Sequence, residues 1–185
     1  MDKLCDEARE ITLREGYSTF VWGEGPSQAR NAIIGEAPGA EEVREGRPFV
    51  GRAGRLLRAE LSAANFEPDK CWITNVVKHR PTKGSANRPP NVLEIDFWLP
   101  ILVRELSIVN PSHIICLGGV AAKAMLMEYD KMSKWRGKWF ELPSGVRLMV
   151  TYHPSYVIRA LAFKDQEIVR NFRRDLAVFA SECPR

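Results

Sequence analysis

Four short apolar runs recur along this chain, and each is followed by a stretch with the periodicity of an amphipathic helix. The runs span residues 32–34, 71–77, 113–118 and 147–152, and helical patterns cover residues 2–15, 55–64, 91–106, 119–127 and 164–179. Strands that alternate with helices favour a parallel sheet covered on both faces. We therefore predict an α/β fold: a single-domain three-layer α/β/α arrangement around a central, mainly parallel four-stranded sheet. A short extra strand is possible at residues 139–142.

Length and charge narrow the function classes. The 185 residues suit one domain, spanning residues 1–185, that is large enough to bury a substantial core. A net charge of +4 and a pI near 9.0 fit a polyanionic partner. The N-terminal residues are charged and no apolar run is long enough to cross a membrane, so we expect no membrane contact and a cytoplasmic, nucleoid-associated location. The four scattered cysteines form no C-x-x-C pair and are expected to be reduced.

The loop after the first apolar run is unusually rich in glycine. Residues 35–54 contain five glycines, two prolines and one phenylalanine among charged side chains. Glycine lets a backbone turn sharply and approach a ligand closely. The pattern satisfies neither the dinucleotide-binding fingerprint nor the phosphate-binding P-loop. A long glycine-rich loop in a compact domain is usually functional, so we expect a binding site here.

Two further polar loops follow predicted strands, at residues 75–90 and 153–159. Loops that follow parallel strands share one edge of the sheet and can converge on one pocket. Taken singly, Asn75 could cap a strand and His153 could be an ordinary core histidine. Together the three loops supply carboxylates, an amide, an imidazole, an aromatic ring and a basic rim. That set suits an anionic, aromatic, hydrogen-bonding substrate such as a nucleobase in DNA.

Several motifs resemble those of one enzyme superfamily. Residues 35–39 (Gly-Glu-Ala-Pro-Gly) with 46–54, residues 74–78 with Arg80-Pro81 and Asn87-Arg88, and residues 135–137 with 151–156 occur in the order found in uracil-DNA glycosylases. The closest similarity is to the iron–sulfur branch called family 4. The resemblance implies an enzyme that flips uracil out of DNA and hydrolyses its N-glycosidic bond, leaving an abasic site. It implies no membrane and a monomer acting on single- or double-stranded uracil-containing DNA.

The same resemblance assigns roles to individual residues. Phe49 is expected to stack on the extruded base, Asn75 to read the pyrimidine edge, and His153 to hydrogen-bond the uracil O2. Ala37 is expected to line the base pocket, and Asn87 to assist at its rim. Glu36 and Glu42 are the candidate acids for water activation or oxocarbenium stabilisation, with Glu42 favoured for the chemistry and Glu36 for a structural role. Residues 156–159 are expected to form a wedge that enters the duplex. The expected DNA contacts are Lys78, Arg80, Lys83, Arg88, Ser155, Tyr156 and Arg159.

One departure from the family 4 pattern is large. That branch holds an iron–sulfur cluster with four cysteines, whereas the matching positions here are Ala8, Ile11, His79 and Trp98. One histidine cannot hold a cluster, so we expect no cofactor and no metal.

Two alternatives to uracil excision stay open from the sequence. The first is a non-catalytic relative that binds DNA as a replication or repair accessory. The second is a glycosylase for another deaminated base such as hypoxanthine.

Overall fold

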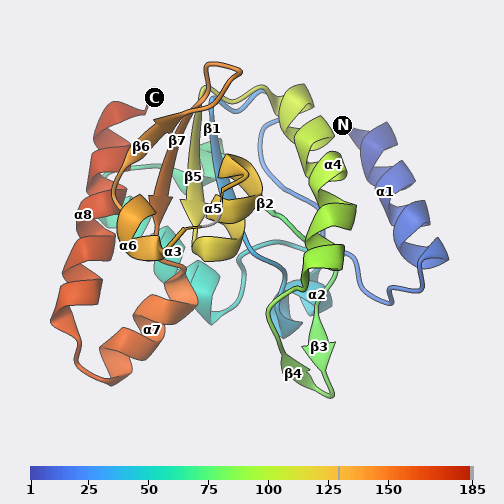
Figure 1. Cartoon of the computed structure of the whole chain (residues 1–185), viewed down its shortest axis with the longest axis horizontal. Helices are drawn as coiled ribbons and strands as arrows, with labels where there is room; N and C mark the ends of the chain where they lie inside the picture. The colour runs from blue at the N-terminus through green and yellow to red at the C-terminus, as the bar shows by residue number, and fades with distance from the viewer. Residues whose placement is uncertain (129, 184–185) are drawn as a thin grey trace.

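A computed structural model describes residues 1–128 and 130–183, and it places a five-stranded sheet at the centre (Figure 1). The strand order is β2-β1-β5-β7-β6, and only β6 runs antiparallel to its neighbour. The mainly parallel α/β sheet is confirmed, but the count of four is one short, because the short stretch near residues 139–142 does pair. The strands are β1 (Asn31–Gly35), β2 (Trp72–Asn75), β5 (His113–Leu117), β6 (Trp139–Glu141) and β7 (Arg147–Thr151).

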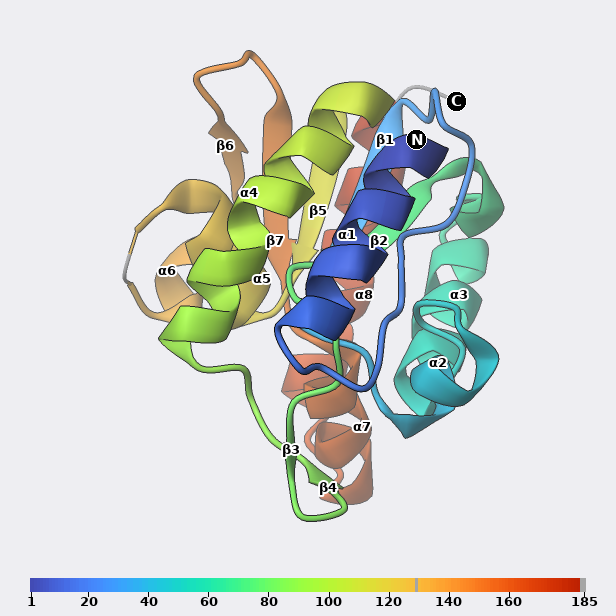
Figure 2. The ribbon, with the colours of Figure 1, turned by 90° about the vertical axis from the view of Figure 1, so that its right-hand side faces the viewer.

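Helices cover both faces of the sheet, as Figures 1 and 2 show from two directions. One apolar cluster joins the sheet to α1, α4, α5 and α6, and a second joins it to α3, α7 and α8. The three predicted layers are therefore present. The helices are α1 (Asp2–Arg14), α2 (Ala40–Glu45), α3 (Arg52–Ala63), α4 (Val92–Val109), α5 (Gly119–Leu126), α6 (Met132–Trp135), α7 (Pro154–Ala162) and α8 (Gln166–Glu182), with a 3-10 turn at Pro68–Lys70.

Successive side chains of each central strand enter opposite clusters. In β1, Ala32 and Ile34 belong to the α4 side and Ile33 to the α8 side. In β7, Val150 and Met149 divide in the same way. Alternation is a property of extended backbone, and burial on both faces explains why these strands are apolar throughout.

Three predicted loops contain regular structure. The glycine-rich loop holds the short helix α2, and the basic loop folds into a hairpin of β3 (Thr82–Lys83) and β4 (Ala86–Asn87). The third, expected to run over residues 153–159, is instead α7, which begins at Pro154 with His153 as its N-cap. Proline suits the first helical position because its missing N–H has no partner there. Val157 of α7 is 1% exposed and packs into the core, so the predicted wedge of residues 156–159 is wrong at this residue.

Across the described ranges, no helix combines the length and apolarity that crossing a bilayer requires.

Candidate active site

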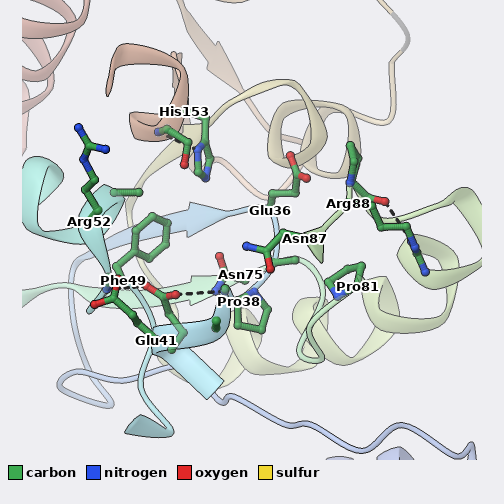
Figure 3. A pocket seen from close by; sticks show the side chains of 18 of the residues that line it. Glu36, Pro38, Glu41, Phe49, Arg52, Asn75, Pro81, Asn87, Arg88 and His153 are labelled. Carbon is green, nitrogen blue, oxygen red and sulfur yellow. Dashed lines mark hydrogen bonds between the residues drawn. The ribbon is translucent and has the colours of Figure 1, made fainter. Parts of the chain in front are cut away.

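A cavity of about 560 Å³ lies where the segments after β1, β2 and β7 meet (Figure 3). Phe49, Asn75 and His153 line it from three different segments. The predicted residues that also line it are Glu36, Ala37, Glu42, Asn87, Arg88, Ser155, Tyr156 and Arg159. Lys78, Arg80 and Lys83 are not among its lining residues.

The Phe49 ring forms one wall and depends on two close approaches of glycine backbone. Phe49 has a φ of 54° and is 5% exposed. A Cβ on Gly54 would lie 2.6 Å from the Phe49 Cα, and a Cβ on Gly35 would lie 2.8 Å from the ring atom Cε2. Only glycine at both positions lets the ring sit against the end of β1.

Asn75 ends β2 directly beside Gly35 of β1. The residue is 3% exposed, and among the described residues none forms a hydrogen bond with its side-chain amide. The Asn75 amide atoms are not among the fully buried unpaired ones of the described residues, so they remain accessible from the cavity. Since Asn75 lines the cavity, its donor and acceptor are available to a ligand there.

His153 is held as a neutral imidazole. Its Nδ1 accepts a hydrogen bond from the Ser155 backbone N–H at 3.2 Å, so the proton of the neutral ring is on Nε2. Burial, together with the nearby Arg159 guanidinium, lowers the pKa of His153 to about 4. Gly118 makes room for the ring: it has a φ of 90°, and a Cβ there would lie 2.9 Å from the His153 Cβ. The site therefore contains an uncharged N–H donor at neutral pH.

The two candidate acids have different surroundings. The Glu42 carboxylate accepts from the backbone N–H groups of Gly39 at 3.1 Å and Gly51 at 2.7 Å, which joins the two ends of the glycine-rich loop. Glu36 has no hydrogen-bond partner for its carboxylate in the described part of the chain, and burial raises its pKa. Glu42 therefore holds the loop together, while the Glu36 carboxylate has no such contact; the sequence favours Glu42 for the chemistry and Glu36 for a structural role.

The predicted phosphate contact at Lys78 is wrong. Its side chain is fully buried, where Nζ donates to the Thr74 hydroxyl at 2.6 Å, to the Asn75 backbone carbonyl at 2.8 Å and to the Glu105 carboxylate. Burial lowers the pKa of Lys78, while the Glu105 charge opposes that shift. Glu105 accepts in addition from Trp72 and Thr74, so the buried pair is hydrogen-bonded throughout. Through its hydrogen bond to the Asn75 backbone carbonyl, Lys78 helps to hold Asn75 in place.

Of the other predicted DNA contacts, one is paired with a protein carboxylate and others are exposed to solvent. Arg88 forms a two-point ion pair with Glu94, at 2.7 Å for each contact, and this pairing, with hydrogen bonds from the Asn91 backbone and His79, lowers the pKa of Glu94 to about 2. Lys83 is exposed on the β3–β4 hairpin, whereas Tyr156 and Arg159 are exposed on α7. Arg52, which the sequence reasoning missed, also lines the cavity at the start of α3 (Figure 3). Its place as the first residue after Gly51 was the available signal.

The residues at the four cluster positions do not fit an iron–sulfur cluster. Both ring nitrogens of His79 are engaged: Nδ1 accepts from the Trp98 indole N–H and Nε2 donates to Glu94, each at 2.9 Å. Trp98 is fully buried and Ala8 is 1% exposed, and both belong to the apolar cluster on the α4 side. The Tyr17 ring stacks on His79 with centroids 3.8 Å apart. Aromatic packing and hydrogen bonds occupy this region, and no group of three or more metal-binding side chains occurs among the described residues.

Comparison with known proteins agrees with the geometry. The profile of the uracil DNA glycosylase superfamily matches residues 22–177. A Type-4 uracil-DNA glycosylase from Pyrobaculum aerophilum is 38% identical over 184 residues, covering 96% of this chain and 88% of the relative. One from Archaeoglobus fulgidus is 34% identical over 171 residues, covering 85% and 84%. A DNA polymerase of Bacillus phage SP01 is 30% identical over 171 residues, which are 92% of this chain and 17% of the polymerase. This chain belongs to the uracil DNA glycosylase superfamily.

Proposed function

We propose that this protein removes uracil from DNA by hydrolysing the N-glycosidic bond, leaving an abasic site. The observation that carries the proposal is the combination, in one cavity, of the unpaired Asn75 amide, the neutral His153 N–H donor and the Phe49 ring. The names of the similar Type-4 uracil-DNA glycosylases support the same substrate.

Base recognition follows from hydrogen-bond polarity. A uracil stacked on Phe49 presents its N3–H donor and O4 acceptor to Asn75, whose amide offers one acceptor and one donor. Cytosine reverses both groups, with an acceptor at N3 and an amino donor at N4. A site built for one polarity rejects the other because buried groups stay unpaired.

Bond cleavage places charge next to His153. As the bond between the sugar C1′ and the base N1 breaks, its electron pair leaves with uracil and negative charge grows on O2. The uncharged Nε2–H of His153 donates to that oxygen without transferring its proton. A donor fixed by the Ser155 backbone needs little reorganisation during the reaction.

Glu36 suits the role of base toward water. Water adds through its oxygen to C1′, one of its protons passes to the Glu36 carboxylate, and the released uracil anion takes a proton from solvent. Burial, which raises the pKa of Glu36, makes its carboxylate the stronger proton acceptor. Glu42 keeps Gly39 and Gly51 in place and shapes the loop that carries Phe49.

The DNA backbone would cross the basic rim. Arg52 and Arg159 line the cavity, and Lys83 is exposed on the nearby hairpin, so these three charges suit phosphate contacts, with Ser155 and Tyr156 on α7 beside Arg159. We further propose that residues 1–185 act as one domain and as a monomer, on single- or double-stranded DNA, in the cytoplasm at the nucleoid.

The test is release of base from end-labelled oligonucleotides that carry one uracil, hypoxanthine, thymine or cytosine, followed by alkaline cleavage at abasic sites. We expect cleavage at uracil and none at cytosine. Asn75→Asp should lose uracil activity and gain some activity on cytosine, since a carboxylate accepts from the cytosine amino group. Cleavage at hypoxanthine alone would reassign the substrate. DNA binding without cleavage of any of these substrates would refute the proposal.

A further inference from the structure

Arg80 lies next to the pocket but does not line it, and its guanidinium is directed along its own hairpin. Its Nε donates to the Asn87 side-chain oxygen at 2.6 Å, and its Nη2 donates to the Ser85 backbone carbonyl at 2.9 Å. These two contacts join Arg80, which precedes the β3–β4 hairpin, to the second strand of the hairpin and to its turn. Arg80 is therefore engaged by protein at the place where the sequence predicted a phosphate contact.

We call these two contacts of the Arg80 guanidinium the brace. The Arg80 backbone that supports the brace is held in place. The Arg80 backbone N–H donates to the Thr19 hydroxyl at 2.9 Å, and the neighbours His79 and Pro81 are buried. Within the hairpin Thr82 pairs with Asn87, and the Arg88 N–H donates to the Pro81 carbonyl at 3.2 Å. The Arg80 side chain thus starts from a well-held backbone and reaches the exposed Asn87 side chain.

The chemistry of the two groups decides which way the Asn87 amide faces. A guanidinium has only donors, so it must meet the amide oxygen, and the amide NH₂ must point away from it. The Asn87 Nδ2 does so: it lies 3.4 Å from the position that a Cβ on Gly39 would occupy, on the glycine-rich loop. Gly39 and Asn87 both line the cavity. Arg80 therefore turns the donor end of Asn87 toward the glycine-rich loop at the cavity.

We propose that Arg80 is a positioning residue that orients Asn87, so that Asn87 offers N–H donors to an oxygen acceptor of the flipped nucleotide. The proposal rests on the proposed function and specifies one part of the same site. Without Arg80, the terminal torsion of an asparagine has two nearly equivalent wells, and the amide oxygen would face the substrate about half of the time. The hairpin would also lose a tie between its strands.

The kinetic test is a double-variant cycle under single-turnover conditions on a uracil oligonucleotide. Asn87→Ala should slow excision about ten- to hundredfold, as expected for one lost donor. Arg80→Ala should slow it about two- to tenfold, because the Asn87 amide is then free to rotate and the loosened hairpin no longer holds Asn87 at the pocket. In the Asn87→Ala background, Arg80→Ala should have no further effect on the rate. A multiplicative effect in the double variant would overturn the proposal.

The Asn87→Asp variant keeps an acceptor for Arg80 but lacks the N–H donors of the amide, so it tests the two roles of Asn87 separately. A carboxylate keeps or strengthens the contact with Arg80 but has no N–H to offer, so this variant should fold normally and be as slow as Asn87→Ala. Retained activity in Asn87→Asp would overturn the donor role. Arg14→Ala is the matched control, since Arg14 is exposed on α1 outside the pocket, and it should leave the rate unchanged.

Salt dependence distinguishes orientation from phosphate binding. If Arg80 orients Asn87, Arg80→Ala should change the rate of the bound complex and leave the slope of DNA affinity against salt unaltered. A weaker affinity with a flatter slope and an unchanged rate would make Arg80 a phosphate contact instead. Substrates with a methylphosphonate beside the uridine identify the acceptor: the Asn87→Ala effect should vanish on them if the oxygen belongs to that phosphate, and should persist if it belongs to the base.

A measurement without DNA keeps this inference separate from the proposed function. The Arg80 Nε–H resonance in nitrogen-15 spectra should be protected from exchange in the wild type and lose that protection in Asn87→Ala. An unprotected resonance in the wild type would refute the brace even if uracil is excised. A protected resonance in a protein that cleaves no uracil would leave the brace in place and refute the proposed function.

Discussion

Gly35→Ala should damage the active site without removing any functional group. A Cβ at this position would lie 2.8 Å from the Phe49 ring atom Cε2, and still closer to the ring atom Cζ and to the Asn75 side-chain oxygen. Ordinary contact begins at 3.4 Å, so Cε2 must move by 3.4 − 2.8 = 0.6 Å and the closer Cζ by more than that. The base-stacking ring and the base-reading amide would be displaced together.

The effect on rate should exceed the effect on stability. Phe49 and Asn75 border an open cavity and can shift into it, so the added methyl should cost at most about 1–3 kcal/mol of folding free energy. Misplacement of reacting groups by about 1 Å can cost about 10²-fold in rate. We expect single-turnover excision of uracil from a single-stranded oligonucleotide to fall by about 10–10²-fold, with the thermal midpoint reduced by a few degrees.

Gly145→Ala is the matched control. Gly145 lies between β6 and β7 with a φ of 80°, and a Cβ there would meet no atom within 4 Å. This variant should lose about 1 kcal/mol from backbone strain and keep its full rate. If Gly35→Ala folds and excises uracil at the wild-type rate, Phe49 and Asn75 cannot both be read as fixed recognition elements.

Three further outcomes are expected. The pKa of His153 is about 4 in the folded protein and 6.5 ordinarily, so the contribution of neutral His153 to the free energy of unfolding is fully present above pH 6.5 and is lost as the pH falls toward 4. The complete loss is about 3 kcal/mol. Urea unfolding at pH 7.5 and pH 5 should show a smaller loss for His153→Gln than for the wild type. Lys78→Met should destabilise the fold by about 3–5 kcal/mol, because the buried Glu105 charge loses its ion-pair partner. The double variant Lys78→Met with Glu105→Leu should recover most of this stability in denaturant melts. Neither variant should alter the slope of DNA affinity against salt. Protein purified anaerobically with iron supplied should contain no stoichiometric iron or sulfide by elemental analysis, and a brown preparation would mean that His79 and Trp98 are not at the cluster positions.

The sequence predicted the sheet well because burial on both faces leaves a direct trace in composition. The apolar run at residues 32–34 lies within β1, and the runs at residues 113–118 and 147–152 contain β5 and β7. The sequence also predicted that the three polar loops converge on one pocket, because the segments that follow parallel strands lie at one edge of the sheet. Short elements such as α2, α6 and the β3–β4 hairpin left too few residues for a period to be detected.

Lys78 shows where sequence reasoning failed and what could have corrected it. It follows an apolar strand and precedes a basic loop, so grouping it with the loop was natural. The missed signal was Glu105, a lone carboxylate between Leu102 and Leu106 on the apolar face of α4. A charge at such a position requires a buried partner, and Lys78 is that partner.

Hydrogen bonds and aromatic packing around His79 hold together three segments beside the pocket. The Glu94 carboxylate receives hydrogen bonds from His79, from the Arg88 guanidinium and from the Asn91 backbone, which joins the end of the hairpin segment to the start of α4. On the other side of His79, Trp98 anchors the ring to α4 and Tyr17 stacks on it from the segment after α1. Three segments distant in sequence therefore meet at one imidazole.

This junction also fixes the start of the hairpin, because His79 is bonded covalently to Arg80. Arg80 in turn holds the Asn87 side chain, which lines the pocket opposite the glycine-rich loop. A substitution that loosens His79, such as Trp98→Phe, removes the indole donor to Nδ1 while it keeps an aromatic ring in the core. Its effect on excision should then depend on Asn87 and disappear in the Asn87→Ala background. An effect of equal size in both backgrounds would mean that the junction acts on the pocket by another route.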